Sequence, residues 1–206
     1  MALTRTRVPA PRAPDHDRLG GVAGNERLTA EAGALLFILL AVLGVTIPAV
    51  GQLMYEHVFL GMLLIPPVLL KLGTTGYRFV RYYTRDPAYR RAGPPAPLLR
   101  MVAPLVVAST LAVFGTGVML LILGPGAGVW RNLHKAAFIA WFVVTSLHVL
   151  AYMWRVPRLA APDWRRGDDR LGGSLHRRLL VGGAVAAGIV LASATVQYAA
   201  AWTSAG

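Results

Sequence analysis

Residues 133–152 read LHKAAFIAWFVVTSLHVLAY, a run in which His134, Lys135 and His148 are the basic residues and none is acidic. An α-helix needs roughly 20 predominantly apolar residues to cross the hydrocarbon core of a bilayer, and this run has that length. The whole chain is 55% hydrophobic and 15% charged, whereas soluble domains carry about 25% charged residues. The run is therefore interpreted as the main part of a membrane-spanning helix over residues 133–154.

Apolar runs of similar length occur on both sides of it. They predict an all-α integral membrane bundle of five transmembrane helices, which places the chain in a lipid bilayer. The other four spans are expected at residues 28–50, 57–80, 101–123 and 179–202.

The segments between and before these spans are polar. Residues 1–27 are rich in Pro, Gly and Arg and lack an apolar core, so they predict a disordered cytoplasmic tail and not a signal peptide. A core over residues 28–155 follows, then a basic loop over 156–178 and a final helical unit over 179–206.

The basic residues predict the orientation. Of the 21 Lys and Arg residues, 18 lie in the N-terminal tail, the 78–100 segment and the 155–178 segment. Only Arg131 and Lys135 lie on the opposite side, and Lys71 lies within a span. Because cytoplasmic loops carry an excess of Lys and Arg, the N-terminus is expected in the cytoplasm and the C-terminus outside.

Composition also excludes several classes. A formal net charge of +12 is compatible with nucleic-acid binding, but these charges lie between apolar runs, so no nucleic-acid partner is expected. The absence of cysteine excludes disulfides, thiolate metal sites and covalent haem attachment through CxxCH. The excess of Arg over Lys, with many Ala and Gly residues, suggests a bacterial gene and thus a bacterial cell membrane.

Histidines within the spans are the candidate functional residues, because ionisable groups at membrane depth are costly and usually functional. His134 and His148 are 14 residues apart, which in a helix places them within roughly 40° of one face and about 21 Å apart. They are too far apart to bind one metal ion together. Trp141 lies midway on the same stripe, with Phe138 and Thr145.

The second span repeats this spacing. Lys71 follows His57 by 14 residues and Arg78 follows Lys71 by seven; His148 and Arg155 follow His134 at the same offsets. Both spans are expected to run from outside to inside. The register therefore pairs His57 with His134 near the outer leaflet and Lys71 with His148 near the inner one.

With this H-x13-H spacing, the stretch LHKAAFIAWFVVTSLHVLAY resembles the b-type cytochromes of bacterial membranes. That group includes the cytochrome b561-like and ferric-reductase-like membrane domains, in which a four-helix bundle carries haem between parallel helices. The resemblance covers roughly residues 28–155 and rests on His57, His134 and His148. The family pattern has a histidine where this chain has Lys71.

The resemblance implies one or two molecules of haem b, with His57 and His134 as the outer axial ligands. At the inner position His148 would be a ligand, with either Lys71 or His176 as its partner. Lys71 could instead extend to the inner interface or bind a haem propionate. The alternative for each histidine is a structural imidazole that hydrogen-bonds to the backbone, a headgroup or a neighbouring hydroxyl.

The same resemblance implies roles for other side chains. Arg131 would bind a propionate of the outer haem, and Arg78 and Arg155 would do so for an inner one. Small residues beside a porphyrin would let it approach the backbone, with ordinary helix packing as the alternative; the candidates are Gly44, Gly115 and Gly117. Gly182, Gly183 and Gly188 are expected to serve packing alone.

The function that follows is a membrane electron-transfer cytochrome b. No nucleotide- or flavin-binding motif occurs, so an electron-transfer subunit that works with quinone or a redox partner protein is favoured over a stand-alone enzyme. The alternative is a haem-free membrane scaffold, accessory subunit or small transporter. Transport has little support, because Glu31 and Glu56 are expected at span ends.

Overall fold

The computed structural model describes residues 20–93, 97–164 and 172–203, and in these residues all regular secondary structure is helical. Five helical segments are long and apolar enough to cross a membrane: Gly21–Ala49, Met54–Tyr83, Arg100–Leu123, Gly128–Ala151 and Ser174–Thr203. The predicted fold class, an all-α bundle with five candidate membrane spans, is therefore confirmed.

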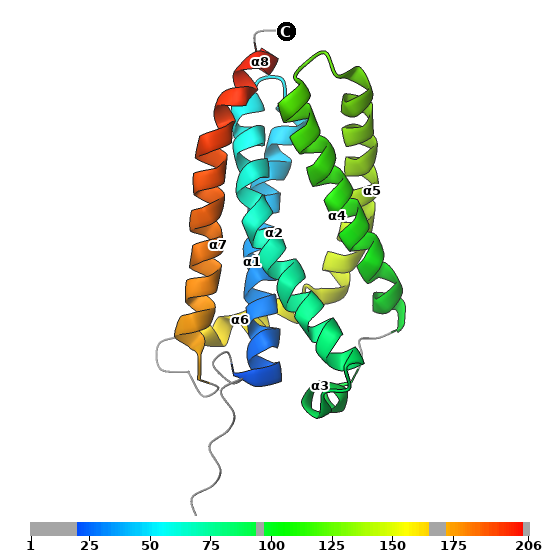
Figure 1. Ribbon diagram of the computed structural model, residues 1–206, viewed down its shortest axis with the longest axis vertical. Helices are drawn as coiled ribbons and strands as arrows, with labels where there is room; N and C mark the ends of the chain where they lie inside the picture. The colour runs from blue at the N-terminus through cyan, green and yellow to red at the C-terminus, as the bar shows by residue number, and fades with distance from the viewer. Residues whose placement is uncertain (1–19, 94–96, 165–171, 204–206) are drawn as a thin grey trace, which may run out of the picture.

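The long helices form two groups (Figure 1). In the first group, α2 (Met54–Tyr83) packs against α1 (Gly21–Thr46) and α7 (Ser174–Thr195), and α6 (Val156–Trp164) packs on α1. In the second, α4 (Pro97–Leu123) and α5 (Gly128–Tyr152) form a hairpin. The groups meet mainly where α4 touches α2 and the short helix η3 (Val196–Ala199). The remaining short elements are η2 (Ile47–Ala49), α3 (Pro87–Arg91) and α8 (Ala200–Thr203).

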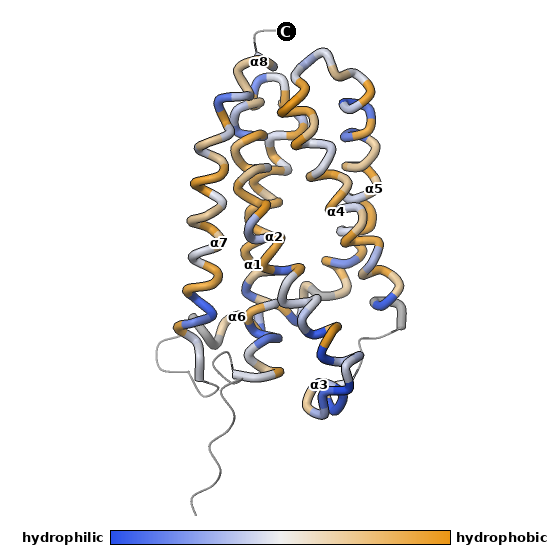
Figure 2. Tube along the Cα trace, viewed as in Figure 1, coloured by the Kyte–Doolittle hydropathy of each residue, from blue (hydrophilic) through white to orange (hydrophobic). Residues whose placement is uncertain are grey.

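The bundle has two distinct ends. One end holds the α1–α2 and α4–α5 turns together with α8, and we call it the hairpin end; α3 and α6 lie at the other (Figure 1). Apolar residues follow the long helices between the ends, and hydrophilic residues gather around α3 and the nearby ends of α2 and α7 (Figure 2). Large apolar side chains such as Ile38, Leu69 and Val190 are exposed on the outside. Such a surface suits a lipid environment and not water.

Two predicted boundaries were wrong. Helix α1 begins at Gly21, within the expected tail over residues 1–27. Its first turns are held by α2, because the Asn25 amide donates to the Thr74 carbonyl at 3.2 Å and Arg78 pairs with Glu26 at 2.6 Å. Residues 1–19 lie outside the described part of the chain.

The expected loop over residues 156–178 is also partly helical. It contains α6 and the first turn of α7, which begins at Ser174. Ala160 of α6 is buried against the bundle, so packing on α1 stabilises a helix within a basic, proline-containing segment. Residues 165–171 lie outside the described part.

A proline in α2 sets the contact with α7. Both Pro66 and Pro67 lie inside the continuous helix, and the Leu63 carbonyl lacks its usual helix hydrogen bond because residue 67 has no N–H. A Cβ added to Gly188 would lie 3.2 Å from the Leu63 carbonyl carbon and closer still to its oxygen. The Gly188 Cα–H therefore points at that oxygen, a weak hydrogen bond that recurs at helix interfaces.

The expected packing role of the span-five glycines is thus confirmed for Gly188. At Gly182 and Gly183 an added Cβ would meet nothing within 4 Å, so those two do not mark a close contact.

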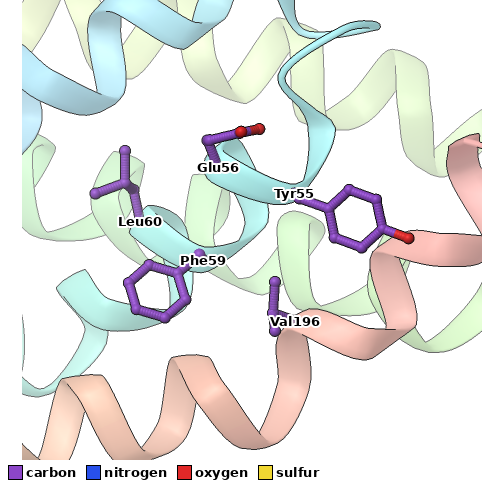
Figure 3. Close-up of a pocket in the computed structure, with 5 residues that line it drawn as sticks. All are labelled: Tyr55, Glu56, Phe59, Leu60 and Val196. Carbon is purple, nitrogen blue, oxygen red and sulfur yellow. The ribbon is translucent and has the colours of Figure 1, made fainter.

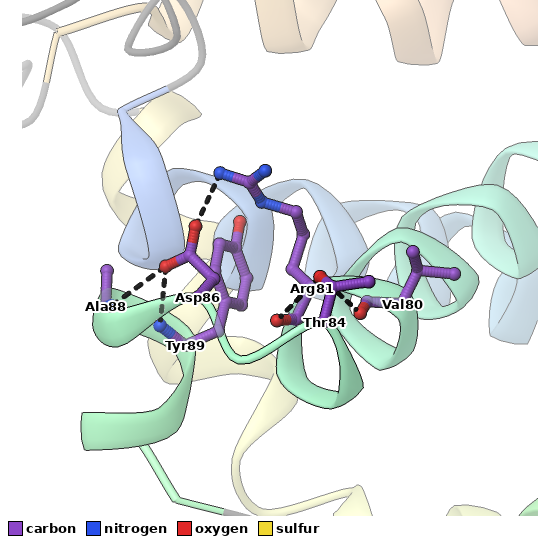
Figure 4. A network of polar contacts seen from close by, with 6 residues as sticks. All are labelled: Val80, Arg81, Thr84, Asp86, Ala88 and Tyr89. Atoms are coloured by element: carbon purple, nitrogen blue, oxygen red, sulfur yellow. Dashed lines mark hydrogen bonds and ion pairs between the residues drawn. The ribbon is translucent and has the colours of Figure 1, made fainter.

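The α2–α3 corner is closed by a polar network (Figure 4). Arg85 turns the chain with a left-handed φ of 64°, and the Asp86 carboxylate accepts from Ala88 N–H at 2.8 Å while pairing with Arg81. Burial, reinforced by the neighbouring Tyr77, raises the pKa of Tyr89 above its ordinary value. These contacts stabilise the turn between the end of α2 at Tyr83 and the start of α3 at Pro87.

Candidate functional site

Two histidines face the same region at the hairpin end. His57 lies in the first turn of α2, and His134 lies in the second turn of α5. Both side chains are half-buried, and the two rings are close enough to interact electrostatically. The fold therefore brings together, from its two helix groups, the pair that the sequence register places opposite each other.

The His57 ring is held by a threonine at the end of α1. Thr46 Oγ1 lies 2.9 Å from His57 Nδ1, and the same hydroxyl donates to the Leu43 carbonyl at 2.6 Å. A hydroxyl has one proton, and a carbonyl can only accept. With its proton on the Leu43 carbonyl, the Thr46 oxygen is free to accept from a His57 Nδ1–H, an arrangement that leaves the lone pair on Nε2.

The His134 ring is held in the same way by α4. Thr116 Oγ1 lies 3.0 Å from His134 Nδ1 and donates to the Ala112 carbonyl at 2.7 Å. The same reasoning assigns His134 the Nδ1–H tautomer. Both histidines thus carry their basic nitrogen at Nε2, the form in which a neutral imidazole ligates a metal.

Gly117 makes room for His134. A Cβ added there would lie 3.2 Å from His134 Cε1, so the ring lies directly against the α4 backbone. Gly115 is exposed, and a Cβ added to Gly115 or Gly44 would meet nothing within 4 Å. Of the three candidate glycines, Gly117 is the one with a contact at the histidine pair.

The predicted stripe on α5 forms its inner face. Phe138, Trp141, Thr145 and His148 are all half-buried, whereas Ile139, Phe142 and Leu147 are exposed on the other side. Trp141 Nε1 donates to Thr110 Oγ1 on α4 at 3.1 Å. This bond and the His134–Thr116 bond tie α5 to α4 at two levels.

A second pair lies deeper in the bundle. Lys71 of α2 and His148 of α5 interact electrostatically, so the fold also brings together the inner pair of the register. The Lys71 ammonium, however, donates to the Thr29 carbonyl of α1 at 2.6 Å. A Cβ added to Gly33 would lie 3.0 Å from Lys71 Nζ, which shows that the amine rests against α1.

The arginines have protein partners. Arg78 pairs with Glu26, and Arg131 donates to the Pro125 carbonyl at 2.6 Å with its guanidinium 5.5 Å from the Trp202 ring centroid. Arg155 is exposed just beyond α5, and His176 is exposed in the first turn of α7. Arg78 and Arg131 are thus engaged by groups other than the histidines.

One expectation about acidic residues was wrong. Glu31 lies ten residues into α1 and is 3% exposed, so it is a buried carboxylate and not a residue at a span end. Glu56 is exposed in the first turn of α2, as expected. Among the described residues, no group of three or more His, Cys, Asp or Glu side chains could hold a metal ion.

A surface pocket of about 370 Å³ lies at the start of α2, between that helix and η3 (Figure 3). Tyr55, Glu56, Phe59 and Leu60 of α2 line it with Val196 of η3. It is apolar apart from the Glu56 carboxylate and the Tyr55 hydroxyl, and it adjoins the turn of α2 that carries His57.

The sequence reasoning missed the threonines. Nothing in the hydropathy pattern distinguishes Thr46 and Thr116 from other threonines in helices. Their role depends on the hydrogen bonds to His57 and His134, which only the fold creates. A usable signal is a threonine near the end of one helix followed, after a short turn, by a histidine near the start of the next.

No family model, curated protein or solved structure matches this chain. Fold and composition define a multi-pass helical membrane protein. The resemblance to membrane b-type cytochromes stays a prediction from the histidine pattern.

Proposed function

We propose that this protein is a membrane electron-transfer cytochrome b that holds haem b between α2 and α5, with His57 and His134 as axial ligands. The observation that carries the proposal is the histidine pair itself. Two imidazoles from different helix groups lie near each other at one level of the bundle, each engaged through Nδ1 and each with its Nε2 lone pair directed away from its threonine.

The residues present fit such a group. Two neutral imidazoles that each donate a hydrogen bond from Nδ1 are a typical pair of haem ligands, because that hydrogen bond fixes the tautomer and the ring orientation. A haem with two imidazole ligands exchanges single electrons and leaves no iron position for oxygen. Because a haem needs only two protein ligands, the lack of a cluster of three among the described residues is compatible with this proposal.

We further propose one haem and not two. At the inner level the partner of His148 is the Lys71 amine, which donates to the Thr29 carbonyl and rests against Gly33, so it is directed to α1 and not to a ligand position beside His148. Arg78, the proposed inner propionate partner, is paired with Glu26. The inner pair is thus better suited to binding or relaying a proton or an anion than to a second axial site.

The excess of Lys and Arg on one side supports a cytoplasmic N-terminus and an external C-terminus, so that His57 and His134 would lie near the outer leaflet. The Arg-, Ala- and Gly-rich composition supports a bacterial cell membrane. Of the two partner classes, a redox protein or a quinone, the pocket beside His57 favours a quinone. It offers an apolar surface in which the Tyr55 hydroxyl would donate to a quinone carbonyl oxygen and the Glu56 carboxylate would accept from a quinol hydroxyl.

The test is a haem measurement on the full chain. The protein would be expressed in haem-replete bacterial membranes and purified in detergent, and a pyridine haemochrome assay would give the haem-to-protein ratio. We expect about one haem b per chain, with a sharp α-band in the reduced-minus-oxidised spectrum. A ratio near two would contradict the single site. Folded protein without haem would overturn the cytochrome proposal in favour of a haem-free scaffold or transporter.

A further inference from the structure

We infer that Thr46 and Thr116 are positioning residues that hold the two histidines in one tautomer and one ring orientation. The inference about haem rests on the proposed function, whereas the inference about the tautomers rests on the hydrogen bonds alone. Neither threonine is expected to touch the iron or the macrocycle.

The same arrangement occurs twice, in two separate helix hairpins. In each, the first helix supplies a threonine, the second supplies a histidine, and the hydroxyl proton goes to a carbonyl of the threonine's own helix. Thr46 is 5% exposed, so its hydroxyl has no access to bulk water. The threonine oxygen is therefore an acceptor whose direction is set by the helix backbone.

This geometry decides which imidazole nitrogen keeps a lone pair that can bind a metal. Without the threonine acceptor, the His57 ring can rotate by half a turn, and its proton can move to the other nitrogen. Either change would turn the lone pair away from the region shared by α2 and α5. His134 also has a backbone hydrogen bond with Val113, so Thr46→Val is the sharper of the two tests. A hydrogen bond donated by Nδ1–H also raises the basicity of Nε2, which favours the ferric over the ferrous state.

The test compares Thr46→Val and Thr116→Val with Thr46→Ser and Thr116→Ser. Valine keeps the shape and removes the acceptor, and serine restores the hydroxyl. Thr195→Val is the matched control, because the Thr195 hydroxyl bonds only to carbonyls of its own helix at Leu191 and Ala192. All variants would be made in the full chain and purified in the same detergent.

Two readouts would be recorded. Loss of the hydrogen-bond partner of a metal-binding histidine costs about 10–100-fold in metal affinity, so each valine variant should bind haem at least tenfold more weakly. Its midpoint potential should also rise, since a tenfold loss of ferric preference equals about 59 mV for a one-electron couple. The serine and Thr195→Val proteins should match the wild type in both.

The second readout is independent of haem. Histidine-selective 15N NMR on the chemically reduced full chain should show both rings protonated at Nδ1, with slow solvent exchange of that proton. The exchange should become at least tenfold faster at the affected ring in each valine variant. Equal exchange and equal haem affinity in the valine and wild-type proteins would overturn the inference.

The two proposals fail in distinguishable ways. If the wild-type chain contains no haem, the proposed function fails, but the NMR spectrum still reports the tautomers directly. Nδ1–H rings in that haem-free chain would uphold the positioning role of the threonines, and Nε2–H rings would refute it. If haem is present and insensitive to both valine variants, the cytochrome proposal stands and the positioning role is refuted.

Discussion

Replacing His57 or His134 by alanine will remove essentially all haem from the purified protein, whereas His148→Ala will keep about the wild-type ratio. In the proposed site one imidazole from each helix group would bind the iron, so each alanine variant would remove one of the two protein ligands. The Lys71 amine, which the register pairs with His148, is held on α1 by the Thr29 carbonyl and so is not expected to supply a second ligand at that level. Haemochrome ratios measure the effect.

The matched control for this series is His176→Ala, because His176 is exposed in the first turn of α7. It should keep full haem content. Size-exclusion profiles would establish that each variant is folded before its haem content is compared. Haem retained in both His57→Ala and His134→Ala would contradict the proposed site. Haem lost in His148→Ala would show that His148, at the inner level, is needed for haem binding.

Replacing Gly188 by alanine will destabilise the bundle by about 1–3 kcal/mol, the usual cost of overpacking. The added Cβ would overlap the Leu63 carbonyl, and backbone atoms cannot move aside as a flexible side chain would. Helix α7 must then move away from α2. The Leu63 carbonyl, which has no helix N–H partner because residue 67 is proline, then also loses its contact with Gly188. Thermal unfolding in detergent should show a midpoint lower by about 2–12 °C, on the scale for chains of 150–250 residues.

Gly183→Ala on the same helix is the matched control, since an added Cβ there meets nothing within 4 Å. That variant should be neutral or slightly more stable, because alanine favours a helix over glycine by up to about 1 kcal/mol. Equal midpoints for Gly188→Ala and Gly183→Ala would show that α2 and α7 are not in backbone contact at Leu63. A larger loss in Gly188→Val than in Gly188→Ala would strengthen the interpretation.

The five spans could be predicted because apolar length is a local property. A run of about 20 apolar residues has few options other than a membrane helix, since a backbone in lipid must satisfy its own hydrogen bonds. The ends of the helices were less predictable. Asn25 and Glu26 look like tail residues, and they join α1 only because Thr74 and Arg78 of α2 lie beside them.

The histidine register was accessible from sequence for a similar reason. Equal 14-residue offsets on two parallel helices place matching positions at matching depths, whatever lies between them. The direction of each side chain was not accessible in this way. Lys71 has the depth that the register requires, yet its ammonium lies on α1, because the Thr29 carbonyl accepts from it and Gly33 leaves space for it.

The sequence by itself thus determined which segments are apolar enough to cross a membrane and at which depths His57, His134, Lys71 and His148 lie. Only the tertiary structure decided the partners of those side chains: Thr46 and Thr116 for the outer histidines, and the α1 backbone for Lys71. The physical reason is range. Hydropathy and helical pitch act along one chain segment, whereas a hydrogen bond requires two atoms from different helices within about 3 Å.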